Sequence, residues 1–517
     1  MRPRRLLLAA CSLPLLLALS PLPARDPVLP RLVVVLTIDQ LRPDYLSRWE
    51  SQWTGGFRRL LDGGAVFLEG WQDHALTETA PGHSTILSGR HPARNGIANN
   101  TLGVPDTTVR LVGAEGTGAS PFRFQGTTLI DWMRGADSGL RFLSVSRKDR
   151  SAILPIGRSK GPVFWYVDGG FTTSTWYADQ LPAWVTEWNG RGGAAKLAGH
   201  RWQLLLPDSA YSEVDSQPWE HGGKDLTFPH SLPADAGKVL DALTDQPWID
   251  SLTLDFALTG AQALQLGDRR RPDVLAVSLS GTDAIGHEYG PDSREIHDHL
   301  LRVDRYLGAF FDSLESTVGK GQLLVVLTAD HGVTPFPELA LARGREAGRI
   351  PFGKLVWSVN RKLGGALSAG SGIVLVDTLK LQAAKVNRES LATNLVAQVQ
   401  KLPGVLDAWT PGTLGAPLPS NIPAARWRRS LPPGLQWLVV AAAKPGYIWS
   451  DGPGSTTHGT SNADDANVPV IFYGMGVRAG RYSDTVSTVD IGPTLARSLG
   501  VKVTEKVDGR VVKAALR

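Results

Sequence analysis

Three long runs of apolar, largely β-branched residues give the clearest structural signal in the chain. They cover residues 31–39, 273–280 and 322–330. None of them alternates between apolar and polar side chains, so each is typical of a strand that is buried on both faces of a parallel sheet. Shorter apolar runs at 140–146 and 468–473 predict two further strands.

Apolar positions recur every three or four residues in the segments between these strands. This spacing predicts a long helix at about 296–314, and further helices at 57–61, 127–134, 251–266 and 488–499. Strands that alternate with helices favour an α/β fold with a mainly parallel central sheet flanked by helices.

Two stretches interrupt the alternation. Residues 155–271 are irregular and rich in Trp, Gly and Pro, apart from the helix at 251–266, and residues 335–450 are irregular as well. We interpret both as insertions that form a cap or rim on one domain spanning residues 25–517.

Carboxylates follow the three long strands. Asp39 and Asp330 end their runs, and Asp283 comes three residues after the run at 273–280. The carboxyl ends of parallel strands meet at one edge of a sheet, which is also where ligands bind in such folds. Three aspartates together would repel one another and resist ionisation, so cations are expected beside them.

Histidines accompany these aspartates: His287 is four residues after Asp283, His331 follows Asp330, and His458 lies in a loop before the 468–473 strand. Mixed nitrogen and oxygen ligands suit divalent metals, zinc above all. For any single pair the alternative is a surface turn with a capping aspartate. For the other histidines we expect structural roles, with at most one touching the site: His74, His83, His91, His200, His221, His230, His297 and His299.

The stretch from Thr79 to Asn100 predicts a hydroxyl at the start of a short helix. Thr79 stands where a cap residue would, Pro81 suits a first helical turn, and Gly89 with Pro92 ends the run. Helix N-termini attract anions such as phosphate. Taken alone, however, the pattern fits a simple helix cap equally well.

The first 24 residues resemble a secretory signal peptide, with three arginines before an apolar run at 6–19 and small residues near Ala24. We expect cleavage there and an exported, periplasmic or secreted protein without a membrane span. Cleavage would lower the formal charge from +5 to +2 because it removes three arginines and no acid. The segment Leu8-Ala9-Ala10-Cys11 resembles a lipoprotein cleavage box. It comes too early in the apolar run to favour lipid anchoring.

Cys11 is the only cysteine, so disulfides and thiolate ligands are excluded from the mature chain. Two short arginine clusters, at 269–271 and 426–429, are too narrow for a nucleic-acid interface, and no nucleic-acid binding is expected.

The motifs at these positions occur in a fixed order: Ile-Asp39-Gln-Leu-Arg, Thr-Glu-Thr79-Ala-Pro-Gly-His, Gly-Ile-Ala-Asn-Asn100, Gly-Thr-Asp283-Ala-Ile-Gly-His287, Ala-Asp330-His331-Gly and His458-Gly-Thr. They resemble the motifs of the alkaline phosphatase superfamily, and more closely its phosphodiesterase/nucleotide-pyrophosphatase branch, from residue 31 to about 500.

This resemblance implies two zinc ions and a threonine nucleophile. Asp283, His287 and His458 would hold one zinc. The other would be held by four residues: Asp39, Asp330, His331 and Thr79. Thr79 would also attack the phosphoryl group, and Asn100 matches the family's contact to the phosphoryl oxygens.

The segment Ser146-Arg147-Lys148-Asp149-Arg150 resembles the Lys-x-Arg segment of the phosphate-irrepressible alkaline phosphatases, in which both cations bind the phosphoryl group. A solvated charged turn is the alternative for this segment. Because a monoester dianion carries an anionic oxygen that a diester lacks, Lys148 and Arg150 favour a phosphomonoesterase of broad specificity acting on small phosphate esters.

Other functions remain as alternatives. A phosphodiesterase or nucleotide pyrophosphatase is the first, and a non-catalytic metal- or phosphate-binding relative is a distant second. A sulfatase is disfavoured, because Thr79-Ala-Pro-Gly-His lacks the Cys/Ser-x-Pro-x-Arg motif of that class.

Overall fold

The structure is a computed structural model that describes residues 29–416 and 422–517. The expected signal peptide and Cys11 lie outside the described residues. Within them, no helix combines the length and apolarity that a membrane crossing requires.

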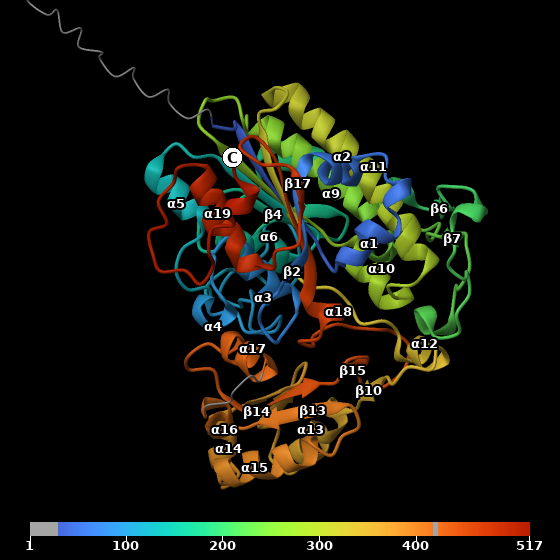
Figure 1. The fold of residues 1–517 in the computed structure, drawn as a ribbon, viewed down its shortest axis with the longest axis vertical. Coiled ribbons are helices and arrows are strands. Elements are labelled where there is room, and N and C mark those ends of the chain that lie inside the picture. Colours follow the sequence, from blue (N-terminus) through green and yellow to red (C-terminus); the bar gives the residue numbers. More distant parts are fainter. Residues whose placement is uncertain (1–28, 417–421) are drawn as a thin grey trace, which may run out of the picture.

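A large twisted sheet forms the centre of the molecule (Figure 1), with strand order β17-β2-β16-β9-β1-β8-β3-β4-β5. Its first two strands are β17 (Gly480–Tyr482) and β2 (Gly64–Trp71). At its middle β1 (Leu32–Ile38) pairs in parallel with β8 (Asp273–Leu279) and β9 (Leu323–Thr328). On one side β16 (Asn467–Gly474) runs antiparallel to β9. The predicted α/β fold with a mainly parallel sheet is therefore confirmed.

Alternate residues of β1 point into two different cores, because successive side chains of a strand face opposite sides of the sheet. Leu32, Val34 and Leu36 pack into the core that α9 (Trp248–Ala263) and α11 (Arg294–Val318) cover. Val33 and Val35 pack into the opposite core. Both faces of β1 are buried, which explains why its sequence shows no polar alternation.

The helices on the second face include the one that begins at the expected nucleophile, Thr79. They are α3 (Thr79–Ile86), α5 (Leu129–Ala136) and α19 (Ile491–Ser498), and Figure 1 shows α5 and α19 on the side of the sheet away from α9 and α11. The capping box of Thr128 and Asp131 begins α5, in agreement with the helix predicted near 127–134.

The stretch 155–271 contributes to the main body as well as to its rim. It contains the edge strands β4 (Val163–Val167) and β5 (Gly170–Thr172) of the large sheet, and helix α9. A small antiparallel pair of strands, β6 (Arg201–Trp202) with β7 (His230–Ser231), lies in the more irregular part of the same stretch.

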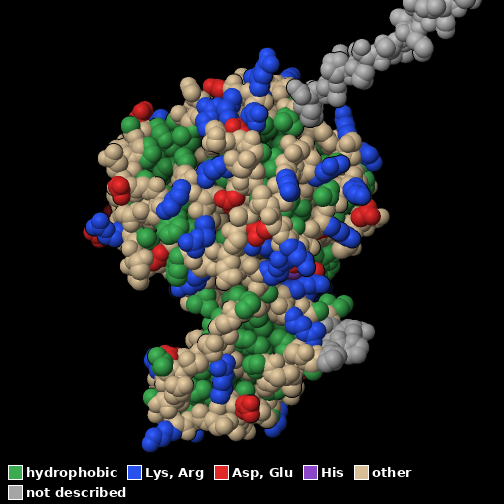
Figure 2. Space-filling view, turned by 90° about the vertical axis from the view of Figure 1, so that its left-hand side faces the viewer, with side chains coloured by type: hydrophobic (Ala, Val, Ile, Leu, Met, Phe, Trp, Pro, Cys, Tyr) green, Lys and Arg blue, Asp and Glu red, His purple; other side chains and the backbone are tan. Residues whose placement is uncertain are grey.

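The stretch 335–450 forms a lobe with regular structure of its own. Its antiparallel sheet has the order β11 (Leu367–Ala369), β12 (Ile373–Val376), β14 (Trp437–Ala443) and β13 (Val405–Trp409). Residues such as Ile350, Leu395 and Val439 belong to its own apolar core. A second, smaller core with Leu76, Ile373 and Trp427 joins the lobe to the main body. Figure 2 shows this junction as a narrower waist between body and lobe.

Candidate active site

The three strand-end aspartates gather at the carboxyl edge of the large sheet. Asp39 directly follows β1, Asp330 follows β9 by two residues, and Asp283 lies in the first turn of α10 (Gly281–Tyr289), which begins just after β8. The backbone N–H of Asp39 donates to the carbonyl of Leu279, 2.9 Å away, which extends the parallel pairing up to the site. All three side chains are buried.

Asp283, His287 and His458 form a first group, which we call the Asp283 group. One ligand atom from each lies within 4.8 Å of the others. Residues four apart lie on one face of a helix, so Asp283 and His287 share a face of α10. His287 Nε2 lies 3.3 Å, and His458 Nε2 3.6 Å, from Asp283 Oδ1.

Asp39, Asp330 and His331 form a second group, the Asp39 group, whose ligand atoms meet the same 4.8 Å limit. His331 Nε2 lies 3.4 Å from Asp39 Oδ1. The imidazole of His331 stacks on that of His458 with ring centroids 3.6 Å apart, so the two groups are neighbours.

Backbone carbonyls fix the orientation of all three imidazoles. Nδ1 of His287 lies 2.8 Å from the carbonyl oxygen of Thr456, and Nδ1 of His458 lies 2.7 Å from that of Thr77. Nδ1 of His331 lies 3.0 Å from the carbonyl oxygen of Gly332. A carbonyl oxygen can only accept, so each Nδ1 donates, and each Nε2 presents a lone pair to its group. This is the arrangement that metal-binding histidines require.

Three buried atoms of the Asp39 group have no hydrogen-bond partner among the described residues: Asp39 Oδ1, Asp330 Oδ2 and His331 Nε2. Burial, together with the charges of Asp283 and Asp330, raises the pKa of Asp39 to about 8. A divalent cation would satisfy these three atoms and favour the ionised carboxylates. Each group combines carboxylate oxygens and imidazole nitrogens, so the donor set fits zinc.

Lys148 lies between the two groups. Its ammonium donates to Asp39 Oδ2 and to Asp283 Oδ2, each 2.5 Å away, and the side chain is buried. Burial alone would raise the pKa of Asp283, but the charges of Lys148 and His287 hold it well below its ordinary value. The turn after β3 (Phe142–Ser146) thus brings Lys148 into the metal-ligand cluster, instead of leaving it in solvent.

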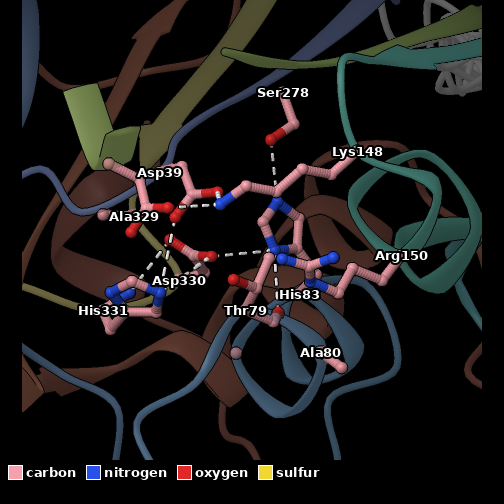
Figure 3. A network of polar contacts seen from close by, with 12 residues as sticks. Asp39, Thr79, Ala80, His83, Lys148, Arg150, Ser278, Ala329, Asp330 and His331 are labelled. Carbon is pink, nitrogen blue, oxygen red and sulfur yellow. Dashed lines mark hydrogen bonds and ion pairs between the residues drawn. The ribbon is translucent and has the colours of Figure 1, made fainter. Parts of the chain in front are cut away.

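Arg150 lies in α6 (Asp149–Ile153), which packs against α3. Figure 3 shows its side chain reaching toward Thr79. Its Nε is buried and has no hydrogen-bond partner among the described residues. The Nε–H of Arg150 is therefore free to donate a hydrogen bond near Thr79.

Thr79 is the first residue of α3, and its side chain is buried. The cap position belongs to Glu78, so the expectation that Thr79 itself caps the helix is wrong. Because Thr79 is not used as a cap, its hydroxyl is available at the positive end of the helix. Asn100 lies beside it, since Asn100 Oδ1 accepts from the backbone N–H of Ala80, 2.8 Å away.

Two residues at this site, His83 and Gln40, lie within the sequence motifs but were not among the predicted site residues. His83, one helical turn after Thr79, contacts Asp330 Oδ2 through Nδ1 at 3.1 Å and Ser278 Oγ through Nε2 at 2.8 Å (Figure 3). The Gln40 amide donates to Asp283 Oδ1 at 2.8 Å, and its backbone N–H donates to Asp330 Oδ1 at 3.2 Å. The only sequence signal for them was position: Gln40 directly follows Asp39, and His83 comes four residues after Thr79.

His297 and His299 are both buried on α11 (Arg294–Val318). His297 contacts Glu213 and Gln52, while His299 contacts Thr282. The first insertion covers this part of α11, which the local sequence of the helix does not reveal.

A family model described as type I phosphodiesterase / nucleotide pyrophosphatase matches residues 33–464. The chain belongs to this family. Every residue of the two ligand groups, Thr79 and Asn100 falls inside the matched range. The resemblance seen in the sequence motifs is thereby confirmed.

Several relatives carry a narrower name. Alkaline phosphatase PhoV of Synechococcus elongatus is 34% identical, over 94% of this chain and 93% of its own. Alkaline phosphatase PafA of Elizabethkingia meningoseptica is 31% identical, over 93% of this chain and 94% of its own. The crystal structure of wild-type PafA superposes with a TM-score of 0.87 at 31% identity, covering 95% of this chain and 99% of that one.

A more distant neighbour shares the fold alone. The structure of murine ectonucleotide pyrophosphatase/phosphodiesterase 5 gives a TM-score of 0.51 at 15% identity.

Proposed function

We propose that this chain is an exported phosphomonoesterase of the alkaline phosphatase type, with broad specificity for small phosphate esters. The observation that carries the proposal is the position of Lys148, whose ammonium contacts both candidate metal-ligand groups. The names of the full-length relatives PhoV and PafA support the same activity.

Two zinc ions complete the proposed site. The Asp283 group would hold one, and the Asp39 group with Thr79 would hold the other. Bound zinc supplies positive charge that stabilises the attacking and leaving oxygens and lowers the pKa of a nearby hydroxyl. The unpartnered Asp39 Oδ1 and His331 Nε2, and the orientation of the three histidines, support this assignment.

Thr79 acts as the nucleophile in this proposal. Its Oγ attacks phosphorus, the bond from phosphorus to the ester oxygen breaks, and the alcohol leaves after taking up a proton. Water then attacks the phospho-threonine, releasing inorganic phosphate and restoring the Thr79 hydroxyl. The positive end of the α3 helix dipole favours the negative charge of the phosphoryl oxygens during both steps.

Asn100 and the two cations bind the phosphoryl group. Because Asn100 Oδ1 is occupied by the N–H of Ala80, its Nδ2 remains as a donor to a phosphoryl oxygen. Lys148 and Arg150 supply positive charge for the additional anionic oxygen of a monoester. An ester group in place of that oxygen would leave part of this charge uncompensated.

Export rests on the N-terminal sequence pattern. N-terminal sequencing of protein recovered from the periplasm or medium is expected to begin near residue 25. A chain that stays in the cytoplasm with an intact N-terminus would contradict export.

Acid quenching during turnover, followed by peptide mass spectrometry, tests the nucleophile. We expect a phosphate on Thr79, its absence in Thr79→Ala, and loss of turnover by at least about a thousandfold in that variant. Full activity after removal of metal, or a phosphate on another residue, would overturn the mechanism. A non-catalytic relative would bind zinc but give no turnover.

A phosphodiesterase or nucleotide pyrophosphatase is the second candidate, and the description of the matching family favours it. A phosphate monoester compared with its methyl or phenyl diester separates the two activities. Dominant turnover of the diester would assign the chain to the second candidate.

A further inference from the structure

The segment between Thr79 and Asn100 is closed by two hydrogen bonds on either side of the nucleophile. Glu78 Oε2 accepts from the backbone N–H of Asn100 at 2.9 Å. Asn100 Oδ1 accepts from the backbone N–H of Ala80 at 2.8 Å. The residues before and after Thr79 are thus both bonded to Asn100, which fixes the Asn100 side chain relative to the Thr79 hydroxyl.

The other carboxylate oxygen of Glu78 binds a residue from the lobe. Ser371 Oγ donates to Glu78 Oε1 at 3.0 Å. Ser371 lies at the tip of the hairpin of β11 (Leu367–Ala369) and β12 (Ile373–Val376). Glu78 therefore has one oxygen on the nucleophile segment and the other on a chain segment almost three hundred residues away.

The tip of this hairpin is held firmly. The backbone N–H of Gly370 donates to the carbonyl of Ile373 at 2.9 Å, and that of Ala441 donates to the carbonyl of Gly372 at 2.8 Å. Since Ala441 belongs to β14 (Trp437–Ala443), the tip is bonded to the sheet of the lobe.

Ser371 also packs against the loop that carries His458. A Cβ added to Gly459 would lie only 2.6 Å from Ser371 Oγ, and Gly459 has a φ of +107°. The backbone N–H of Gly459 donates to Thr77 Oγ1 at 3.2 Å. The hairpin tip therefore touches the nucleophile segment and the segment of a candidate metal ligand at the same point.

We infer that Glu78 is a positioning residue that links the lobe to the phosphoryl-binding group: Ser371 orients the Glu78 carboxylate, and Glu78 orients Asn100 beside Thr79. This inference deepens the proposed function and rests on it. It gives the second insertion a role in setting the geometry of phosphoryl transfer.

The chemistry of the link distinguishes two substitutions of Glu78. In Glu78→Gln the amide oxygen accepts from the Asn100 N–H, and the amide nitrogen donates to Ser371 Oγ, which accepts as well as donates. Both hydrogen bonds survive while the charge is lost. In Glu78→Ala both are lost, and the backbone N–H of Asn100 loses its partner.

A double-mutant cycle with Asn100 tests the inference. We expect Glu78→Ala to lower kcat/KM for a phosphate monoester about tenfold, Ser371→Ala about threefold, and Glu78→Gln by less than about threefold. In the Asn100→Ala background, Glu78→Ala should lower kcat/KM by less than about twofold, because Glu78 acts by positioning the Asn100 side chain. A tenfold loss in both backgrounds would overturn the inference.

The affinity for inorganic phosphate, measured by calorimetry, gives a second reading of the cycle that needs no turnover. The same coupling is expected there, with Tm and zinc content recorded for each variant. Ser368→Ala, an exposed serine on β11, is the matched control for Ser371→Ala. Equal behaviour of these two serine variants would overturn the link even where Glu78→Ala fails to fold.

The two proposals fail in different ways. If Thr79→Ala keeps full turnover, the proposed nucleophile is wrong. If Thr79→Ala is inactive but the Glu78 and Asn100 losses are additive, only the link is wrong.

Discussion

The carboxylate of Asp330 is held by a histidine that comes from the nucleophile helix. His83 Nδ1 lies 3.1 Å from Asp330 Oδ2 and 2.9 Å from the carbonyl oxygen of Thr79, while its Nε2 contacts Ser278. The same ring thus touches a candidate metal ligand and the backbone of Thr79, the proposed nucleophile. Such neighbours orient metal ligands, and their loss commonly weakens metal binding.

Replacing His83 with alanine should therefore weaken zinc binding by about 10- to 100-fold. Zinc titration against a competing chelator measures the effect, with Tm recorded to detect unfolding. His200→Ala is the matched control, since His200 is exposed. Zinc affinity in His83→Ala equal to that of the control would contradict the assigned role.

The N-terminus of helix α10 is capped by an aspartate side chain of helix α9. Asp250 Oδ1 accepts from the backbone N–H groups of Ser280 and Gly281, both at 3.0 Å. It is fully buried and lies at the positive end of the helix that carries Asp283 and His287. The packing of one element thereby sets the position of two ligands on another.

Asp250→Ala should lower the free energy of unfolding by about 1–2 kcal/mol through loss of this cap. It should also weaken zinc binding, because α10 loses its fixed start. Asp250→Asn keeps an oxygen acceptor, so it is expected to retain most of the stability and most of the zinc affinity. Denaturant unfolding and zinc titration measure the two effects, with the exposed Asp241→Ala as control. A zinc affinity unchanged in Asp250→Ala would contradict this account.

A short turn from the first insertion packs against the other end of α10 and contains a buried acid. Burial, with the nearby charge of Glu295, raises the pKa of Glu220 to about 9. The neutral acid is favoured in the folded state. The contribution of Glu220 to stability is therefore present below its ordinary pKa near 4.5 and is lost as pH rises toward 9.

Glu220→Gln, which stays neutral, should be more stable than the wild type at pH 9 by about 2 °C in Tm and nearly equal to it at pH 5. Thermal unfolding at both pH values measures the difference. An equal difference at the two pH values would show that ionisation of Glu220 plays no part.

Long buried elements and their ends could be predicted from the sequence, but short elements could not. The runs at 31–39, 273–280 and 322–330 match β1, β8 and β9, since a strand buried on both faces must be apolar throughout. Their terminal aspartates could then be placed on one edge. Strands such as β11 have only three residues, too few to show a pattern, so the lobe looked irregular.

Side-chain contacts between distant segments could not be predicted either. The link from Glu78 to Ser371 and the contact from Gln40 to Asp283 depend on how whole elements pack. Burial of His297 and His299 likewise depends on the cover that the first insertion places over α11.

Across the whole molecule, the site joins segments that lie far apart in the chain. The two ligand groups draw on residues from Asp39 to His458, and the lobe contacts the same edge of the sheet through Ser371. Metal binding to both groups would hold these segments together, while the metal-free protein leaves three buried carboxylates near one another.

Zinc should therefore stabilise the fold, by about 2.7 kcal/mol per site when free zinc is 100-fold above the dissociation constant. Thermal unfolding of chelated protein should show Tm rising as zinc is added, and metal analysis of the zinc-loaded protein should give two zinc ions per chain. A Tm insensitive to zinc, or one bound ion per chain, would contradict the paired sites.

The assignment as a monoesterase depends on Lys148 and Arg150, and one comparison tests it most directly. It measures kcat/KM for a phosphate monoester and for its methyl diester, in the wild type and in the Lys148→Ala/Arg150→Ala double variant, with zinc content verified. The wild type should prefer the monoester, and the double variant should lose at least about a hundredfold on the monoester and far less on the diester. Equal losses on both substrates, or a wild type that prefers the diester, would contradict the account.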